Sequence, residues 1–335
     1  MAPSRRHSTI YDVAARAGVS IGTVSKTLNH PSAVAEPTRR RVLDAVQALA
    51  FVPKEAAQAR ARRNCGRIGV FAPFTSYPSF AERLNGVLSA LPGNRAEVVV
   101  FDVQSAAESS HVLETLPAMR SLDGVIVMSV PISLDVALRL QEGRLPAVFV
   151  DVSCPGFPAV ATDDELGGRL AGDALLAAGK RRCAFLGHAQ VQPAFESPSR
   201  RRLEGFQAAL AAQGLALAPE SVVLTGRSFD DAAAAATRIL SGSHPPDGIF
   251  AHTDELAAAA HLAAQRLGLN VPEDLGIIGF DDSTLAEALE LTTIRQPLRE
   301  TGRWAFTTLT AMIADPSMVA PSVTLPVTLV RRRSV

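Results

Sequence analysis

Residues 9–29, TIYDVAARAGVSIGTVSKTLN, predict two short helices joined by a tight turn. Thr9 with Asp12 forms a helix-start pattern, and the apolar residues that follow recur at i, i+3, i+4 and i+7. Gly18 supplies a turn residue that tolerates unusual backbone angles, and Ser20 supplies an N-cap for the second helix. Two such helices around a glycine turn are typical of a helix-turn-helix.

The second helix is expected to turn Val24 and Leu28 inward. The residues left on its outer face are Ile21, Gly22, Ser25, Lys26 and Asn29. A third helix is expected to begin near Pro37, with the arginines of residues 39–41 beside its apolar side. Three helices around one small apolar centre predict a complete DNA-binding headpiece.

The formal net charge of zero conceals an asymmetry along the chain. Residues 1–64 hold 11 Lys/Arg against 4 Asp/Glu, whereas residues 65–335 hold 22 against 29. A small basic module joined to a larger acidic one is typical of nucleic-acid binding at one end. Taken alone, the charge is equally consistent with a basic solvated face.

The length of 335 residues, of which 47% are hydrophobic, predicts two or three folding units. No apolar run reaches the roughly 18 residues that cross a bilayer, and no apolar stretch follows the basic start. We therefore expect a cytoplasmic protein without a membrane segment. Cys65, Cys154 and Cys183 are widely spaced and form no Cys-x-x-Cys, so we expect reduced thiols and no metal site.

From residue 67 onward, short β-branched runs alternate with amphipathic helical stretches. The runs are residues 68–72, 98–102, 125–130, 147–151, 183–187, 249–251 and 277–279. This rhythm predicts parallel strands with crossover helices, and open α/β sheets bind ligands at the carboxyl ends of their strands.

Enzymatic motifs are absent from the sequence. There is no Gly-x-Ser-x-Gly, no His-Glu-x-x-His and no Gly-x-Gly-x-x-Gly after a strand. Residues 172–180 end in Gly-Lys, but Arg181 stands where a phosphate loop needs Ser or Thr, so this segment is interpreted as a helix end. We therefore expect no enzyme, no catalytic residue, no cofactor and no metal.

The headpiece motifs together resemble the LacI/GalR family of bacterial transcription regulators. The resemblance rests on residues 9–14, 18–20, 23–29, 38–39, 42–43 and 51–53 and continues into the larger domain. It implies an α/β fold class in which a three-helix helix-turn-helix headpiece and a hinge helix precede a two-lobed effector domain like a type I periplasmic binding protein.

The resemblance also implies the domain limits. The headpiece would span residues 1–53, the hinge segment 54–64, and the effector-binding and dimerisation domain 65–335. Lobe 1 would comprise about 65–160 and 292–322, and lobe 2 about 161–291 and 323–335.

The resemblance implies that the second helix enters the major groove, where Ile21, Gly22 and Lys26 occupy the positions that select bases. Lys26 can donate to guanine and Ile21 can touch a thymine methyl, whereas Gly22 has no side chain to read with. The residues expected to hold phosphates are Thr9, Ser20, Thr23, Ser25 and Asn29. Plain helix capping is the alternative for the hydroxyl residues.

In the family, a leucine of the hinge helix wedges between bases in the minor groove. Arg60 stands at that position, and no Leu or Ile lies between residues 50 and 67. We expect Arg60 to contact the minor groove instead. The competing interpretation is a solvated linker that bears arginines.

Polar residues after predicted strands are the candidates for effector binding. The two acceptor oxygens of Asp281 suit a pair of sugar hydroxyls. Arg202 opens a predicted helix in a position that resembles the family's ligand-clamping arginine, and its planar fork can bind two oxygens. Positions carried over from the family are Ser129, Asp151, Thr253 and Gln296, and aromatic candidates in the first loop are Phe74, Tyr77 and Phe80. The alternatives are core packing for the aromatics and helix capping for Asp254 and Asp282.

The expected partners are double-stranded operator DNA, a small and sugar-like effector, and a second copy of the chain. Because the C-terminus lacks leucine heptads, we expect a homodimer whose headpieces read two halves of a near-palindromic operator, as a repressor at the nucleoid. A solute-binding protein would need an export signal and no headpiece, and a sugar-modifying enzyme would need a catalytic constellation.

Overall fold

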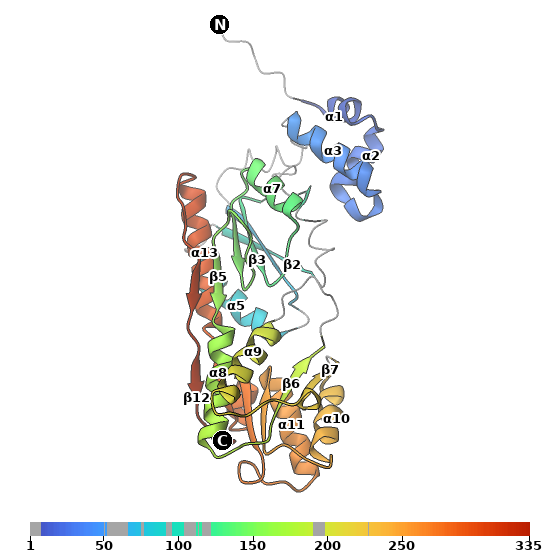
Figure 1. Cartoon of the computed structure of the whole chain (residues 1–335). Coiled ribbons are helices and arrows are strands. Elements are labelled where there is room, and N and C mark those ends of the chain that lie inside the picture. Colours follow the sequence, from blue (N-terminus) through green and yellow to red (C-terminus); the bar gives the residue numbers. More distant parts are fainter. Residues whose placement is uncertain are drawn as a thin grey trace. The chain divides into compact units, whose positions relative to one another are not determined.

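The computed structural model divides the chain into two compact units, Met1–Val160 with Arg299–Val323 and Ala161–Leu298 with Thr324–Val335 (Figure 1). The residues that the structure describes are 8–49, 51, 66–74, 77–91, 96–103, 112, 114–115, 122–189, 198–226 and 228–335. The hinge segment with Arg60 lies outside them, as does Cys65.

The headpiece consists of α1 (Ile10–Ala17), α2 (Ile21–Asn29) and α3 (Glu36–Ala48), with a short 3-10 turn η1 (Pro31–Ala33). The predicted capping box of Thr9 and Asp12 is confirmed, and Gly18 ends α1 with a φ of 65°. The Ser20 side chain caps α2, as predicted. The buried residues that join the three helices are Val13, Ala14, Ala17, Val24, Leu28, Val42, Ala45, Val46 and Phe51.

The described strands of the larger domain form two six-stranded sheets. The first has the order β11-β5-β4-β3-β1-β2, and the second has the order β12-β10-β9-β8-β6-β7. The strands of the first are β1 (Gly66–Ala72), β2 (Ala96–Asp102), β3 (Gly124–Met128), β4 (Ala147–Val150), β5 (Ala159–Thr162) and β11 (Val323–Leu325). Those of the second are β6 (Cys183–His188), β7 (Val222–Thr225), β8 (Gly248–Ala251), β9 (Gly276–Asp281), β10 (Thr292–Arg295) and β12 (Thr328–Val330).

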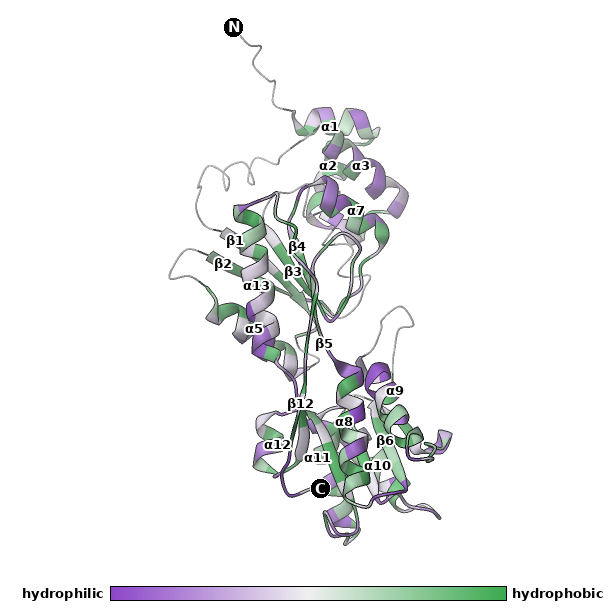
Figure 2. Cartoon of the chain, turned by 60° about the vertical axis from the view of Figure 1, so that its left-hand side comes forward, coloured by the Kyte–Doolittle hydropathy of each residue, from purple (hydrophilic) through white to green (hydrophobic). Residues whose placement is uncertain are grey.

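Amphipathic helices connect the strands. They are α5 (Pro78–Ser89), α7 (Leu134–Glu142), α8 (Asp164–Ala177), α9 (Pro198–Ala211), α10 (Phe229–Leu240), α11 (Asp254–Arg266), α12 (Thr284–Ala288) and α13 (Leu298–Ala314), with the 3-10 turn η2 (Pro219–Ser221). Strands such as β3 are hydrophobic along their length, whereas α5 and α8 mix polar and apolar residues (Figure 2). No helix among the described residues has the length and apolar character that would span a bilayer.

All seven runs predicted as strands are strands, and their neighbours in the main body of each sheet pair in parallel. The prediction missed β5, β7, β10, β11 and β12, which are only three or four residues long. β4 and β8 are equally short but contain no polar side chain, whereas each strand that was missed contains at least one threonine and therefore does not stand out as an apolar run. The segment ending in Gly-Lys is the end of α8, as interpreted, and Lys180 is buried with its Nζ on the carbonyl oxygens of Pro272 and Glu273.

In each unit, two helices touch backbone to backbone through glycines. A Cβ at Gly168 of α8 would overlap the carbonyl of Arg202, and one at Gly205 of α9 would overlap the carbonyl of Glu165. A Cβ at Gly302 of α13 would likewise overlap the carbonyl of Arg83 in α5. These close approaches fix the helices that carry the buried arginines described below.

We predict that Gly205→Ala lowers the free energy of unfolding by about 1–3 kcal/mol or more, because a backbone carbonyl cannot yield to an added methyl. The control is Gly22→Ala in α2, where the nearest atom is 3.7 Å from the new Cβ. Alanine there should instead stabilise the helix by about 0.5–1 kcal/mol. Urea unfolding of the full chain, followed by circular dichroism, measures both. Equal midpoints for Gly205→Ala and wild type would contradict the predicted clash.

Candidate functional site

The outer face of α2 carries the residues predicted to select bases. Ile21 is 39% exposed although it is hydrophobic, and Gly22 and Lys26 are also exposed. Ser25 is half-buried, and the side chain of Asn29 lies outside the described residues. An exposed cation and an exposed branched apolar side chain on one short helix can contact the edges of bases in a major groove.

The hydroxyl residues predicted to hold phosphates are engaged in capping. Thr9 Oγ1 donates to Asp12 Oδ2 at 2.7 Å, and Ser20 Oγ accepts from the Thr23 backbone N–H at 3.1 Å. Ser20 Oγ also lies 2.9 Å from Thr23 Oγ1. Capping leaves these exposed hydroxyls with further hydrogen-bonding capacity toward an anion. Sequence reasoning missed Tyr11, which is 68% exposed on α1 beside them.

In the first unit, two predicted effector residues lie where strands end. Ser129 follows β3 with a φ of 54°, and Asp151 follows β4 with a φ of 56°. Both are buried, and Asp151 forms an ion pair with Arg83 of α5, itself 3% exposed. A buried ion pair at the carboxyl edge of a parallel sheet offers rigid donors and acceptors to a polar ligand.

The predicted aromatic residues surround the same helix start. Phe80 is buried, with its ring centroid 6.4 Å from that of Phe74 and 6.1 Å from that of Tyr77. The Arg83 guanidinium lies 5.6 Å from the Phe80 centroid. Phe80 is therefore a core residue that also supports Arg83, whereas Phe74 and Tyr77 are half-buried.

In the second unit, Arg202 of α9 is only 4% exposed, and its guanidinium contacts a carboxylate, a backbone carbonyl and an aromatic ring. Its Nε donates to Asp164 Oδ1 at 2.8 Å, and its Nη1 donates to the His252 carbonyl at 2.6 Å. Its guanidinium carbon lies 3.5 Å from the centroid of the Phe280 ring. Asp164 also accepts from Arg201 Nη2 at 3.0 Å. This guanidinium is a fixed hydrogen-bond donor.

His252 completes this cluster. Its Nδ1 lies 3.3 Å from Arg202 Nη1, and because guanidinium only donates, Nδ1 accepts and carries no proton. Burial lowers the pKa of His252 well below its ordinary value, and the charges of Arg202 and His188 act in the same direction. The two imidazole rings meet edge to face with centroids 5.8 Å apart. The His252 ring therefore stays neutral.

Asp281 and Gln296 come together after β9 and β10. The Gln296 amide donates to Asp281 Oδ1, and Asp281 has a φ of 112°. Thr253 caps α11 by accepting from the Leu256 N–H, and Ser283 caps α12, so the alternative that Asp254 and Asp282 are the caps is wrong. Both hydroxyl residues precede their helices by one position, where a side-chain oxygen reaches the free amides.

Strained backbone gathers at the predicted effector positions. The predicted effector residues Ser129, Asp151 and Asp281 all have positive φ although none is glycine. Such residues are uncommon and cluster at functional sites, where the surrounding structure must hold them. In the part of the chain that the structure describes, Asp282, Arg144 and Glu290 also have positive φ, and none of these three is a predicted site residue.

Sequence reasoning missed the partners that hold these residues: Arg83, Asp164, His188 and His252. A lone arginine in an amphipathic helix gives no signal that it will be buried. His188 ends β6 and His252 directly follows β8, so the criterion that selected Asp281 would have found both histidines if it had been applied more widely. Asp164 begins α8 after the short strand β5, which the prediction missed, so that criterion gave no signal for it.

A helix-turn-helix joined to a two-unit α/β fold with polar clusters at its strand ends defines a ligand-controlled transcription regulator. A family model for bacterial regulatory proteins of the lacI family matches residues 9–54, and one for a periplasmic binding protein-like domain matches residues 173–335. A ribose operon repressor of Halalkalibacterium halodurans is 32% identical over 299 residues, covering 88% of this chain and 87% of the relative.

Catabolite control protein A of Priestia megaterium is 29% identical and covers 95% of this chain and 96% of its own length. A complex of the transcriptional regulator CelR with cellobiose has a TM-score of 0.70 and 28% identity, and covers 98% of this chain and all of the other. A LacI family regulator from Enterococcus faecium with bound ribose has a TM-score of 0.69 and 28% identity, and covers 80% and 98%.

The chain belongs to the LacI family. It is a DNA-binding transcription regulator, not an enzyme. The fold class implied by the resemblance, a helix-turn-helix headpiece followed by a two-lobed α/β domain like a periplasmic binding protein, is confirmed.

We predict that Asp164→Ala lowers the free energy of unfolding by about 3–5 kcal/mol, because it leaves the charge of Arg202 buried without its carboxylate. The control is Glu165→Ala at the next position of α8. Its side chain is 58% exposed and pairs with Arg169, so its loss should cost at most about 0.5 kcal/mol. Urea unfolding compares the two variants. Similar losses for both would show that the Asp164–Arg202 pair is not a structural requirement.

Proposed function

We propose that this regulator is a repressor that binds a near-palindromic operator as a homodimer and is switched by a sugar-like effector. The proposal rests on two features that one chain combines. Lys26 is exposed on α2, and polar clusters around Arg202 and Asp281 lie at strand ends. We assign the protein to the cytoplasm, at the nucleoid, where the operator is.

The division of labour follows the sequence-based limits. DNA binding belongs to residues 1–53, the hinge to 54–64, and effector binding and dimerisation to 65–335. The base-selecting residues are Ile21, Gly22 and Lys26, and the phosphate-binding residues are Thr9, Ser20, Thr23, Ser25 and Asn29. Arg60 lies in the hinge and is proposed to enter the minor groove.

The chemistry of the strand ends supports a polyhydroxylated effector. Carboxylate and amide oxygens, as on Asp281 and Gln296, accept from hydroxyls, and the guanidinium of Arg202 donates to oxygens. The further polar residues that we propose for effector binding are Ser129, Asp151 and Thr253, and the aromatic ones are Phe74 and Tyr77, whereas Phe80 is buried and supports Arg83. Two structural neighbours hold cellobiose and ribose, so these sugars are the first probes.

We predict that Lys26→Ala weakens binding to the operator far more than to random DNA, since a base-edge contact is worth about 1–3 kcal/mol of discrimination. The control is Arg41→Ala. Arg41 is exposed on α3, so this substitution also removes one positive charge but leaves the sequence of α2 unchanged. Fluorescence anisotropy with the chain's own upstream DNA and with a scrambled duplex measures both. An equal loss on the two duplexes would show that Lys26 only contacts phosphate.

We predict that Arg202→Lys and Asp281→Asn each weaken sugar binding by about ten- to a hundredfold, the effect of losing charged hydrogen bonds, and leave sugar-free operator binding intact. Arg200→Ala is the control, because Arg200 lies on the same helix but is exposed. Calorimetry with ribose and cellobiose measures the affinities. Unchanged affinity in both variants would overturn the proposed effector site.

A further inference from the structure

The turn of residues 281–283 begins at the last residue of β9, the proposed effector residue Asp281, and holds it in an unfavourable conformation. Asp281 has a φ of 112° and Asp282 a φ of 58°, so two consecutive residues with side chains lie in the left-handed half of backbone space. Such a conformation persists only where neighbouring groups hold it. The groups that hold this turn therefore decide where the carboxylate of Asp281 lies.

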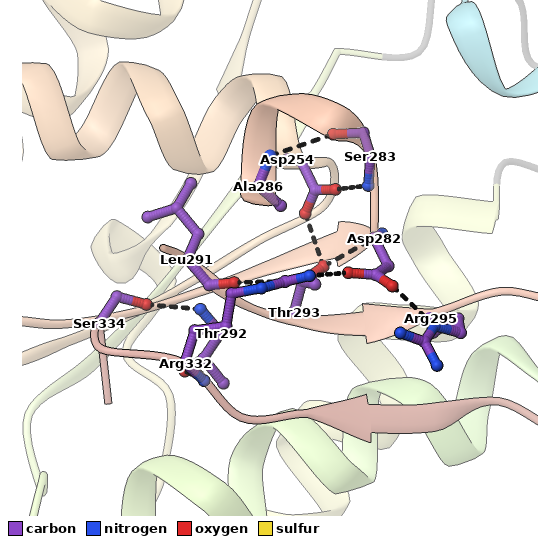
Figure 3. A network of polar contacts seen from close by, with 10 residues as sticks. All are labelled: Asp254, Asp282, Ser283, Ala286, Leu291, Thr292, Thr293, Arg295, Arg332 and Ser334. Atoms are coloured by element: carbon purple, nitrogen blue, oxygen red, sulfur yellow. Dashed lines mark hydrogen bonds and ion pairs between the residues drawn. The ribbon is translucent and has the colours of Figure 1, made fainter. Parts of the chain in front are cut away.

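The carboxylate of Asp254, at the start of α11, lies beside the turn and contacts both Ser283 and Thr293 (Figure 3). Its Oδ2 accepts from the Ser283 backbone N–H at 2.7 Å, and its Oδ1 accepts from Thr293 Oγ1 at 2.6 Å. A Cβ at Gly279 would overlap Asp254 Oδ1, so β9 has a glycine where this carboxylate passes. Asp254 thus ties the turn to both β9 and β10.

The other side of the turn is held by cations. Asp282 accepts from Arg295 of β10 and from Arg332 of the C-terminal segment, at 2.6 Å each. Arg332 is itself anchored, since its Nη1 donates to the Leu291 carbonyl at 2.9 Å. These ion pairs fix Asp282, and Asp254 is left to fix the end of the turn at Ser283.

We propose that Asp254 is a positioning residue: its ionised carboxylate holds the 281–283 turn in the left-handed conformation that presents Asp281. The inference rests on the proposed function, because Asp281 matters only as an effector residue. The described partners of Asp254 are donors, namely the backbone N–H and the hydroxyl of Ser283 and the hydroxyl of Thr293, so a protonated carboxyl offers them one good acceptor oxygen fewer. Proton uptake by Asp254 therefore loosens the turn.

The surroundings place this proton uptake near neutral pH. Burial raises the pKa of Asp254 to about 7, and the negative charge of Asp281 adds to the rise. The helices α10 and α12, which also pack against α11, bury only alanines and one leucine. His252, at the end of β8, stays neutral, and the charge of Asp282 is matched by Arg295 and Arg332.

The raised pKa of Asp254 makes folding stability and the order of the turn change with pH in opposite directions. Because the pKa of Asp254 is higher in the folded than in the unfolded chain, its contribution to stability is present at low pH and is lost as the pH rises through about 7. The order of the turn, by contrast, increases as the pH rises through about 7, because the carboxylate of Asp254 becomes ionised. A merely structural role would make both quantities change in the same direction.

The test is amide hydrogen exchange of the turn in the full chain, without sugar, for Asp254→Asn, Thr293→Val and Thr293→Ser. Asp254→Asn and Thr293→Val should speed exchange of the Ser283 amide on the order of tenfold at about pH 8, and Thr293→Ser should keep the wild-type rate. Thr293→Val also removes the acceptor of the Asp282 backbone N–H, so in this variant only the Ser283 amide reports on Asp254. In wild type, exchange corrected for its intrinsic rate should be faster at about pH 6 than at about pH 8, and in Asp254→Asn this pH dependence should vanish. Asp274→Asn, at the opposite end of β9, is the control.

Unchanged turn exchange in Asp254→Asn would overturn the proposal, and so would slower wild-type exchange at the lower pH. Thermal unfolding at about pH 8 excludes general damage, since Asp254→Asn should melt no lower than wild type. Titration with ribose and cellobiose then measures the consequence. The affinity of the wild type for sugar should decrease when the pH is lowered from about 8 to about 6, and that of Asp254→Asn should not. If neither sugar binds, the proposed effector fails, and the exchange experiment still decides the role of Asp254.

Discussion

Backbone contact between α8 and α9 is the constraint on which the second unit depends. Gly168 and Gly205 let the two helices approach until each meets the carbonyl of the other. That approach brings Arg202 of α9 against Asp164 in the first turn of α8. Larger side chains at the crossing would hold the two helices farther apart and would change the geometry of this buried pair. The position of the Arg202 guanidinium therefore depends on glycine at both crossing positions, Gly168 and Gly205.

Burial turns this pair into a rigid device. Breaking a buried ion pair costs far more than the pair contributes to stability, so such pairs are weak evidence for stabilisation and better evidence for geometry. Here Asp164, the carbonyl of His252 and the ring of Phe280 hold Arg202 from three directions. A donor held in this way loses little conformational entropy when a ligand binds, and preorganisation of this kind increases affinity.

The sequence predicted whatever depends on local periodicity and capping. Thr9, Ser20 and the apolar residues of α1 to α3 specify the headpiece within a few residues of chain, and the β-branched runs specify the buried strands. Arg83 and Asp164 escaped because their burial depends on partners distant in sequence. β10 and β12 are short and contain threonine, so they do not stand out as apolar runs. Asp254 was considered as a cap, but it is the first residue of α11, and the N-cap position immediately before the helix is occupied by Thr253.

The strained residues and the buried charges explain each other. The chain turns sharply at Ser129 and Asp151, which directly follow β3 and β4, and at Asp281, the last residue of β9, and a positive φ at such residues costs backbone energy. Ionic partners from other elements offset this cost: Arg83 binds Asp151 from a helix, and Arg295 and Arg332 bind Asp282 beside Asp281. Because these partners come from distant segments, each turn keeps its shape only while its whole unit is folded. The geometry of the strand ends is therefore a property of the complete α/β fold and of no shorter piece of it.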